Sequence, residues 1–583
     1  MKTIYNVKAL CMVALLGTAA IANAQEDGKK KNLNRELTLE REYAPSVQDA
    51  SKVNTLPVVK QPEARKIPID YSNFTIAADP KKEISLLPSG NVMTQMEYTK
   101  SRGYLNFGAG THLNINGDLG YHILSTEKDN LNVWYSHRST NGNVKYIQEE
   151  QEKVKAKIND NLGGLNFKHV FDKMVLVMGA KYGYSGYNYY GLPIMDVSMG
   201  PDRKTNQVAQ TIAANVGFES HEGAKIGYLL DLGYINFSRK YGLSEDMKGP
   251  KEHTFEAKFD VNAHFNGNMN AGLGGVVEYF NYNLPNEECE FINHAEIMLS
   301  PYYKVVGDNW NVKLGANVMF STGENSEFMA SPNIAADVEV AEKTQLYLNA
   351  GGKMYSNSMY STSLVNRYVL PIEEIAASRN WVDSKIGIKS GIANGFWFDI
   401  FAGYKMTSND VLFVLSGEGE PGGFGNFSEP LTGVDTKQFF AGAELKYSYQ
   451  QLFDITLKGV YNNWKGTYNL DDWIGMTEED ADLDHVYGKP EMEINAGLNI
   501  RPFKNLALQL DYYLATGRYA KVGNLEDYKM NNINELNLTG TYTINKTFGV
   551  YAKLNNILCQ KYEVYYGYPM QGFSAMGGVN INF

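Results

Sequence analysis

The chain has 583 residues and carries 54 basic against 65 acidic side chains, a formal net charge of −11. This acidic balance argues against nucleic acid as a partner. Beyond the first 24 residues, no apolar run approaches the roughly 18 uninterrupted residues of a membrane-spanning helix, so helical spanning is excluded. Cys289 and Cys559 are the cysteines after residue 24, which excludes a disulfide framework. One bridge between them remains open, and two unpaired thiols are favoured.

The first 24 residues have the organisation of a secretory signal peptide. Lys2 and Lys8 provide the charged start, residues 9–21 the apolar core, and residues 22–24 an A-x-A cleavage site. We therefore predict that the mature chain begins at Gln25.

Residues 25–92 predict an extended periplasmic segment with little core of its own. The segment shows no apolar alternation and mixes charges of both signs. Its prolines interrupt regular structure throughout. They are Pro45, Pro57, Pro62, Pro68, Pro80 and Pro88.

Residues 93–583 predict an antiparallel β-barrel. In the last strand, apolar or small residues alternate with polar ones, and the chain stops on an aromatic residue. One face of that strand carries Phe573, Ala575, Gly577, Val579, Ile581 and Phe583. The same alternation recurs upstream, and its very short breaks alternate with longer ones. Outer-membrane barrels have such unequal ends, with short periplasmic turns and long external loops.

The number of breaks predicts the number of strands. Ten short breaks, ten long ones and a tight turn at Asn116 and Gly117 give 21 connections, hence about 22 strands within a range of 18 to 22. An even number puts both chain ends in the periplasm. A cylinder of 22 strands is on the order of 44 Å across, too wide for its own side chains to fill. We therefore predict an all-β transmembrane barrel of the cell outer membrane whose lumen is closed by loops or by another segment.

The signal peptide, the even strand number and the terminal Phe583 resemble the barrel portion of TonB-dependent outer-membrane receptors. Residues 42–54, EYAPSVQDASKVN, followed by Pro57, are similar to the leader of a receptor-like group from Bacteroidota. Receptors of this family carry a globular plug before the barrel, whereas only 68 residues, 25–92, are available here. The resemblance therefore implies a receptor-like barrel without a recognisable plug domain. Residues 55–59, TLPVV, faintly resemble the family's energy-coupling box, although a proline-bearing linker produces the same letters.

The resemblance implies uptake or passage of a polar solute. The alternative is a structural or assembly platform that binds a lipoprotein or periplasmic partner. The leader residues that would meet such a partner are Tyr43, Pro45, Asp49, Lys52 and Asn54. Phe583 resembles the assembly signal that the barrel assembly machinery reads, and outer-membrane lipids would surround the barrel.

No catalytic constellation stands out, so we predict no enzymatic activity and no cofactor. His112 and His122 are expected on the polar face of the first two strands, near each other across the Asn116–Gly117 turn and close to Asp118. Histidine and carboxylate groups can bind metal or transfer protons. Polar residues facing a lumen produce the same pattern, and that interpretation is favoured.

Two further groups of residues have a functional and a structural interpretation. Asp480, Asp482 and Asp484 present oxygens at alternate positions and are a candidate Ca²⁺ site, but an acidic solvated loop is favoured. Six tyrosines near expected strand ends favour an interface girdle over a sugar-stacking platform. They are Tyr187, Tyr189, Tyr190, Tyr565, Tyr566 and Tyr568.

Overall fold

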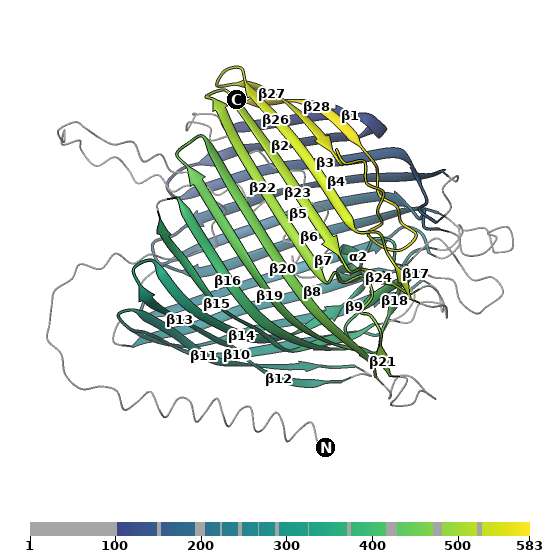
Figure 1. Cartoon of the computed structure of the whole chain (residues 1–583). Coiled ribbons are helices and arrows are strands. Elements are labelled where there is room, and N and C mark those ends of the chain that lie inside the picture. The colour runs from purple at the N-terminus through teal and green to yellow at the C-terminus, as the bar shows by residue number, and fades with distance from the viewer. Residues whose placement is uncertain are drawn as a thin grey trace, which may run out of the picture. The chain divides into compact units, whose positions relative to one another are not determined.

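The wall of the molecule is one antiparallel sheet that closes on itself (Figure 1). The computed structural model describes residues 102–148, 153–192, 205–221, 224–242, 248–265, 268–285, 291–323, 326–369, 375–393, 395–415, 428–469, 481–521 and 527–583. Within these residues the wall is a closed barrel of 22 strands, as the spacing of breaks predicts. The expected signal peptide, the extended segment 25–92 and the leader residues that would bind a partner lie outside the described residues.

Each wall strand pairs with its neighbour along the chain. The first half of the wall consists of β1 (Gly103–Gly110), β2 (Ile115–Ser125), β3 (Asp129–Lys145), β4 (Lys153–Val170), β5 (Met174–Asn188), β6 (Asn206–Ser220), β7 (Ile226–Arg239), β8 (Lys251–Phe265), β9 (Met269–Asn283), β10 (His294–Val306) and β11 (Trp310–Ser321). The second half consists of β12 (Phe328–Pro332) with β13 (Ile334–Ala341), β14 (Thr344–Asn357), β15 (Ile375–Ala393), β16 (Phe396–Ser408), β19 (Val434–Tyr449), β20 (Phe453–Tyr468), β22 (Met492–Phe503), β23 (Leu506–Thr516), β26 (Ile533–Thr543), β27 (Phe548–Asn555) and β28 (Ser574–Asn582).

β12 and β13 together form a single wall strand. β12 and β13 both pair with β11 and are separated only by Asn333. In the long connections, β17 (Leu412–Leu415) pairs with β18 (Ser428–Leu431), and β24 (Tyr519–Ala520) pairs with β25 (Tyr528–Lys529), as two separate sheets. The short β21 (Asp482–Leu483) pairs with the end of β20 and adds no further strand around the barrel. Several wall strands are longer than the roughly 9–11 residues that cross a membrane. The 18 residues of β4 therefore extend beyond the bilayer.

Side chains alternate between lipid and lumen along each wall strand, because successive residues of a strand point to opposite faces. On β5, Tyr182 is exposed on the outer face, whereas Lys181 lines an internal cavity. On β6, Ile212 is exposed outside and Thr211 lines the same cavity. The apolar alternation in the sequence is therefore the lipid-facing half of each strand.

The first hairpin differs from the prediction. Asn116 and Gly117 lie within β2, where Asn116 pairs with Gly108 of β1. The connection is instead a short 3-10 turn, η2 (Thr111–Leu113), in which His112 and Leu113 have φ angles of 57° and 51°. His112 is of a residue type that adopts such a backbone more often than most, but Leu113 is not, so the sequence marks this turn only weakly.

The barrel closes between its first and last strands. β1 and β28 pair from Tyr104 opposite Asn582 to Gly110 opposite Met576. The backbone amide of Gly103 donates to the Phe583 carbonyl at 2.8 Å, and the Phe583 amide donates to the Gly103 carbonyl at 3.0 Å. This closure satisfies both strand edges, which a membrane barrel cannot leave unpaired.

Removing the terminal aromatic tests the predicted assembly signal. Phe583→Ala, and deletion of residues 580–583, should lower the amount of inserted barrel, because the closing strand loses its last pairs or its terminal ring. The measurement is heat-modifiable, protease-resistant protein in the outer-membrane fraction. Phe573→Ala removes another exposed phenylalanine at the opposite end of β28 and is the matched control. Normal insertion of both Phe583 variants would contradict the assigned role.

The two ends of the barrel are unequal. Short turns such as residues 171–173 connect strands at the end that holds Phe583, and the long connections meet at the other end. The long connection between β14 and β15 contains α2 (Met359–Val365), which begins at the N-cap Ser358. No helix among the described residues is long and apolar enough to cross a membrane.

Candidate functional site

Three segments fold inward and close the long-loop end of the barrel. They are α2, the hairpin of β17 and β18, and residues 556–573 between β27 and β28. Their side chains and those at the ends of β3 to β7 form one buried apolar cluster. The cluster includes Val144, Tyr187, Tyr190, Leu192, Phe237, Met359, Tyr368, Leu415 and Tyr568. Burial of this apolar surface holds segments that are far apart in the sequence against one another.

Packed tyrosine rings form the centre of this cluster. Tyr368 and Tyr568 stack with their ring centroids 4.2 Å apart, and Tyr190 meets them edge-on at 5.4 and 5.1 Å. The Tyr146 hydroxyl donates to the carbonyl of Tyr190 at 2.9 Å. Such offset and edge-to-face pairs add stabilisation beyond the area that they bury.

The predicted interface girdle is therefore wrong for these tyrosines. Tyr187, Tyr189, Tyr190 and Tyr568 are all buried, and Tyr568 is only 1% exposed. Tyr565 and Tyr566 are partly buried against the same cluster. Tyr187 occupies a lumen-facing position of β5, and Tyr568 lies on an inward-folded loop. Their rings consequently contact each other rather than lipid.

A buried arginine ties α2 to the barrel wall. Arg239, the last residue of β7, donates from Nη1 to the hydroxyls of Tyr187 and Tyr189 at 2.8 and 2.9 Å. Its Nη2 donates to Ser363 Oγ and to the carbonyl of Val369, each at 2.9 Å. The side chain is 3% exposed, so these bonds form away from water. Hydrogen bonds from a charged donor are stronger than neutral ones, so Arg239 makes a major stabilising contact at the closed end.

A buried glutamate holds the start of the same helix. Glu252 on β8 accepts from Ser358 Oγ at 2.9 Å and from the backbone amide of Tyr360 at 3.0 Å. Thr254 Oγ1 donates to the same carboxylate at 3.0 Å. The first amides of a helix lack partners within the helix, and a carboxylate at this position satisfies them. α2 is thus bound to the wall at its start by Glu252 and near its end by Arg239.

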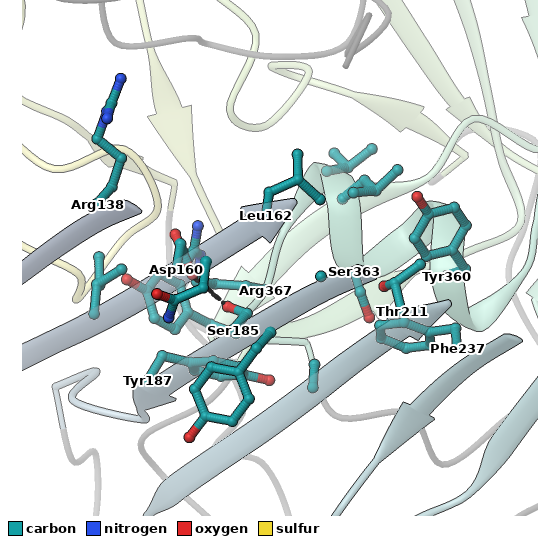
Figure 2. Close-up of a pocket in the computed structure, with 18 of the residues that line it drawn as sticks. Arg138, Asp160, Leu162, Ser185, Tyr187, Thr211, Phe237, Tyr360, Ser363 and Arg367 are labelled. Carbon is teal, nitrogen blue, oxygen red and sulfur yellow. Dashed lines mark hydrogen bonds and ion pairs between the residues drawn. The ribbon is translucent and has the colours of Figure 1, made fainter. Parts of the chain in front are cut away.

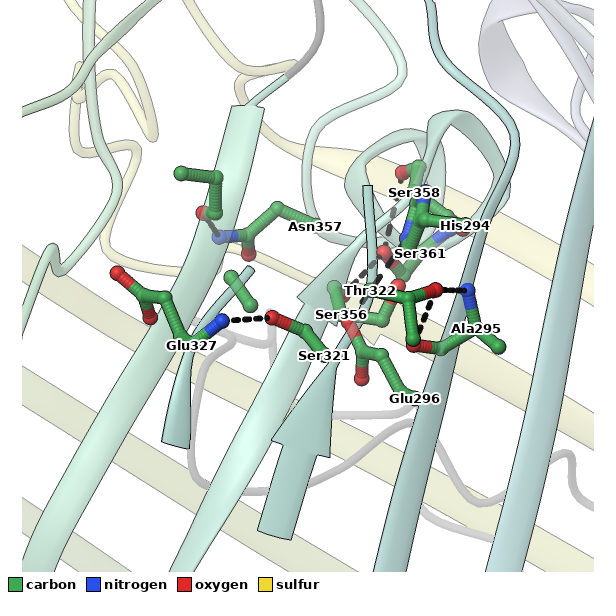
Figure 3. Close-up of polar contacts among 12 residues, drawn as sticks. His294, Ala295, Glu296, Ser321, Thr322, Glu327, Ser356, Asn357, Ser358 and Ser361 are labelled. Carbon is green, nitrogen blue, oxygen red and sulfur yellow. Dashed lines mark hydrogen bonds and ion pairs between the residues drawn. The ribbon is translucent and has the colours of Figure 1, made fainter. Parts of the chain in front are cut away.

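The neighbouring rim is fixed by polar contacts as well (Figure 3). Thr322, in the connection between β11 and β12, accepts the backbone amide of Ala295 at 2.8 Å, and Ser321 Oγ accepts the amide of Glu327 at 3.0 Å. Arg379 pairs with Glu327 at 3.1 Å. The connection between β11 and β12 is therefore bound to the adjacent strands. The lumen is covered instead by the three inward segments described above.

A cavity of about 620 Å³ lies against the inner wall beneath these segments (Figure 2). β3 to β7 supply the wall, and α2, the residues that follow it and the 556–573 loop supply the cover. Its size falls within the roughly 300–1,000 Å³ of small-molecule sites. The cavity combines tyrosine rings with charged groups, and is the most site-like feature among the described residues.

Ion pairs hold most of the cavity's charged groups in place. Arg367 pairs with Asp160 at 3.0 Å, and Ser185 Oγ donates to the same carboxylate at 2.6 Å (Figure 2). Burial opposes the charge of Arg367, but the nearby Asp160 raises its pKa above the usual value. Arg138 pairs with Asp118 of β2 at 2.8 Å. Polar side chains of the wall, such as Asp160 and Thr211, thus line the cavity together with apolar ones such as Phe237, and tyrosines come from both the wall and the cover.

The residues that the sequence singles out for metal or proton chemistry do not meet. His112 lies in η2, where its Nε2 is 3.4 Å from the Phe573 carbonyl, whereas His122 lies near the far end of β2. The expected proximity of the two histidines is wrong, because the turn is not at Asn116 and Gly117. Asp118 is the partner of Arg138 instead.

The candidate calcium residues are only partly described. Asp482 is in β21 and pairs with Thr467, and Asp484 follows it, whereas Asp480 lies outside the described residues. Among the described residues, no group of three or more His, Cys, Asp or Glu side chains could hold a metal ion. The calcium site stays a prediction. Cys559 is an exposed free thiol, and Cys289 falls outside the described part of the chain.

The sequence does not identify Arg239, Glu252 or Arg367 as structural or site residues. Each is a single charged residue within or beside an alternating strand, and many lumen-facing positions look alike. A charged residue at the end of a strand next to tyrosines, as at Arg239, is a weak signal that could have drawn attention to it.

Comparison with known proteins identifies the fold. The chain matches no protein-family model and no curated protein sequence. A mutant of the ferric enterobactin receptor PfeA from Pseudomonas aeruginosa has a similar structure, with a TM-score of 0.60, 12% identity, and coverage of 82% of this chain and 80% of that one. The copper transporter OprC matches with a TM-score of 0.59, 10% identity, and coverage of 84% and 82%. The ferripyoverdine receptor of the outer membrane of Pseudomonas aeruginosa matches with a TM-score of 0.58, 12% identity, and coverage of 83% and 72%.

At this level of identity the matches establish the fold alone. The chain is a closed 22-stranded β-barrel whose fold resembles that of TonB-dependent outer-membrane receptors. The predicted likeness of the barrel is confirmed. The likeness of the leader to a Bacteroidota group and the lack of a plug concern residues outside the described part, and stay predictions.

Proposed function

We propose that this chain is an outer-membrane receptor or channel-like barrel that passes a polar solute through a lumen gated by its own loops. The observation that carries the proposal is the cavity of about 620 Å³ between the inner wall and a cover of packed loops. A barrel of 22 strands encloses more space than its side chains fill. The inward segments close one end of that space and would have to move for a solute to pass.

The similar structures support transport but not a particular cargo. Their names refer to ferric enterobactin, copper and ferripyoverdine, which all contain a metal, but at 10–12% identity these matches show the fold alone. The solute of this chain therefore has to be found from its own residues.

Reconstitution of the purified full chain tests the proposal. Liposomes that contain the protein should admit small polar solutes faster than empty liposomes, with a size limit set by the loops, and swelling rate is the measurement. Liposomes with a heat-denatured sample are the control. If no solute of any size or charge enters faster than into empty liposomes, the barrel is not a passage.

The closed end also suits the alternative of a structural or assembly platform, because Arg239 and Glu252 fasten the loops firmly. Deletion of residues 32–88 separates the two functions. This deletion removes no described strand and should leave a heat-modifiable barrel. If the leader binds a periplasmic partner or lipoprotein, a co-purifying protein is lost. If the leader closes the lumen, permeability to large antibiotics rises. An unchanged partner set and unchanged permeability would mean that the leader does neither.

A further inference from the structure

The cavity continues along the barrel wall in register across three strands. Near the closed end, Tyr187 of β5 faces Ile158 of β4. The next two lumen-facing positions of β5, moving away from the closed end, hold the small residues Ser185 and Gly183. The third holds Lys181, which lies between Gly164 of β4 and Ala213 of β6. Because lumen-facing positions occur at every second residue, Lys181 lies about 20 Å along the wall from Tyr187.

Lys181 lines the same cavity as the tyrosines of the cover. Ala213 is its small neighbour on β6, whereas on the β4 side the Trp134 indole lies over Gly164. A groove therefore runs down the wall from the tyrosine-lined cover to a cation. A larger residue at Gly183 would narrow it, because Gly183 lines the cavity beside Leu162 and Thr211.

Lys181 differs from the other charged groups of the cavity because no described carboxylate pairs with it directly. Arg367 is paired with Asp160, and Arg138 with Asp118. With the described residues, Lys181 forms neither a hydrogen bond nor an ion pair. The charge of Glu256 acts on it, but that carboxylate is itself paired with Lys258 at 2.7 Å.

We propose that this cavity binds a small solute that has a ring and one anionic group, with a carboxylate or phosphate at Lys181 and the ring toward the tyrosine-lined cover. The inference rests on the proposed function and deepens it by naming the chemical class of the solute. The geometry supplies an ammonium without a directly paired carboxylate at one end and, at the other, the partly buried rings of Tyr360 and Tyr565. Aromatic faces pack against sugar or other rings, whereas the ammonium requires negative charge.

Three probes with the same ring test this assignment: glucose is neutral, glucuronate carries a carboxylate, and glucose 6-phosphate carries a phosphate. Binding to the purified full chain is measured by saturation-transfer NMR in detergent. At least one anionic probe should bind about tenfold or more tightly than glucose, as expected for one charge-assisted hydrogen bond. The difference between the two anions distinguishes carboxylate from phosphate. The preference should weaken as salt is added.

Variants identify the residue responsible. Lys181→Gln should abolish the preference for the anion, and Lys181→Arg should retain it. Lys313→Gln removes a lysine that lines a different, smaller cavity of about 400 Å³, and should retain the preference. Each variant is first checked for heat-modifiability, so that a failure to fold is not mistaken for lost binding. Equal binding of glucose and both anions to the unchanged protein, or an undiminished preference in Lys181→Gln, would overturn the inference.

The result is distinguishable from a failure of the proposed function, because binding is measured without passage. Anion preference at Lys181 in a protein whose liposomes admit no solute would support this inference and overturn the transport proposal. Passage of neutral and anionic probes alike, with no preference in binding, would support transport and overturn this inference.

Discussion

Replacing Arg239 by alanine is expected to open the long-loop end of the barrel. The change removes four hydrogen bonds that a charged donor makes to Tyr187, Tyr189, Ser363 and Val369. It also leaves two buried tyrosine hydroxyls without that donor. A loss of roughly 3 kcal/mol or more is expected, since each bond to a charged group contributes about 1.5–3 kcal/mol. That loss increases the fraction of molecules whose long-loop end is open by about 100-fold.

Permeability of cells to a large antibiotic that the outer membrane normally excludes measures the opening. Cells with Arg239→Ala should become sensitive, and α2 in the purified protein should become accessible to protease. Arg239→Lys keeps the charge but lacks the planar fork that reaches several acceptors, so an intermediate effect is expected. Lys240→Ala changes the next residue, which is exposed, and should have no effect. Normal permeability and protease resistance in Arg239→Ala would contradict the role of Arg239 in stabilising the closed end.

The barrel could be predicted from the sequence because its signals are local. Alternation along a strand depends on residues two apart, and a short break such as Asp172 and Lys173 is visible as a polar interruption. The structure places a turn at residues 171–173, as expected. Break lengths also reveal which end carries the long connections. These features need no knowledge of which distant residues meet.

The first hairpin shows where local signals fail. Asn116 and Gly117 are residues that favour a tight turn, yet the wall extends through them, and the turn uses His112 and Leu113 instead. Pairing of Asn116 with Gly108 of β1 and with Arg138 of β3 outweighs the local preference.

The closed end could not be predicted, because it depends on contacts between segments that are far apart in the chain. Tyr368 and Tyr568 stack across 200 positions, and nothing in either local sequence identifies the other. An aromatic residue at a strand end suits a lipid interface and a buried cover equally well. The structure decides between them through the face on which the ring lies, and the tyrosines of β5 and of the 556–573 loop lie inside.

The 556–573 loop also contains a buried carboxyl that makes the closed state sensitive to pH. Glu563 is 2% exposed, and burial raises its pKa from 4.5 to about 7. Gln148 donates to it at 3.1 Å, and Arg518 acts on it electrostatically while donating to the Glu563 carbonyl at 2.8 Å. Tyr528 and Tyr566 complete its titratable surroundings, and the pKa of each is raised, that of Tyr566 to about 12. Glu563 is thus the member of this group that titrates near neutrality.

The direction of the effect follows from the raised pKa. Below about pH 4.5 the carboxyl is neutral in both the closed and the open loop, and the full stability of the closed state is present. As pH rises from there to about 7, the open loop releases its proton first, so the closed state loses stability. Above pH 7 the buried carboxylate is charged, and the loss amounts to roughly 3 kcal/mol. The closed end should therefore loosen as pH increases through this window.

Glu563→Gln is expected to remove this pH dependence, because the amide has nearly the same shape and stays neutral throughout. In the unchanged protein, liposome permeability to a mid-sized neutral sugar should rise severalfold between pH 5 and pH 8. The glutamine variant should keep the low permeability at both values. Gln148→Ala removes the hydrogen-bond donor but leaves the carboxyl, so its permeability should still rise with pH. A pH response that persists unchanged in Glu563→Gln would assign the titration to another group, because the carboxyl held between Gln148 and Arg518 would then not control the loop.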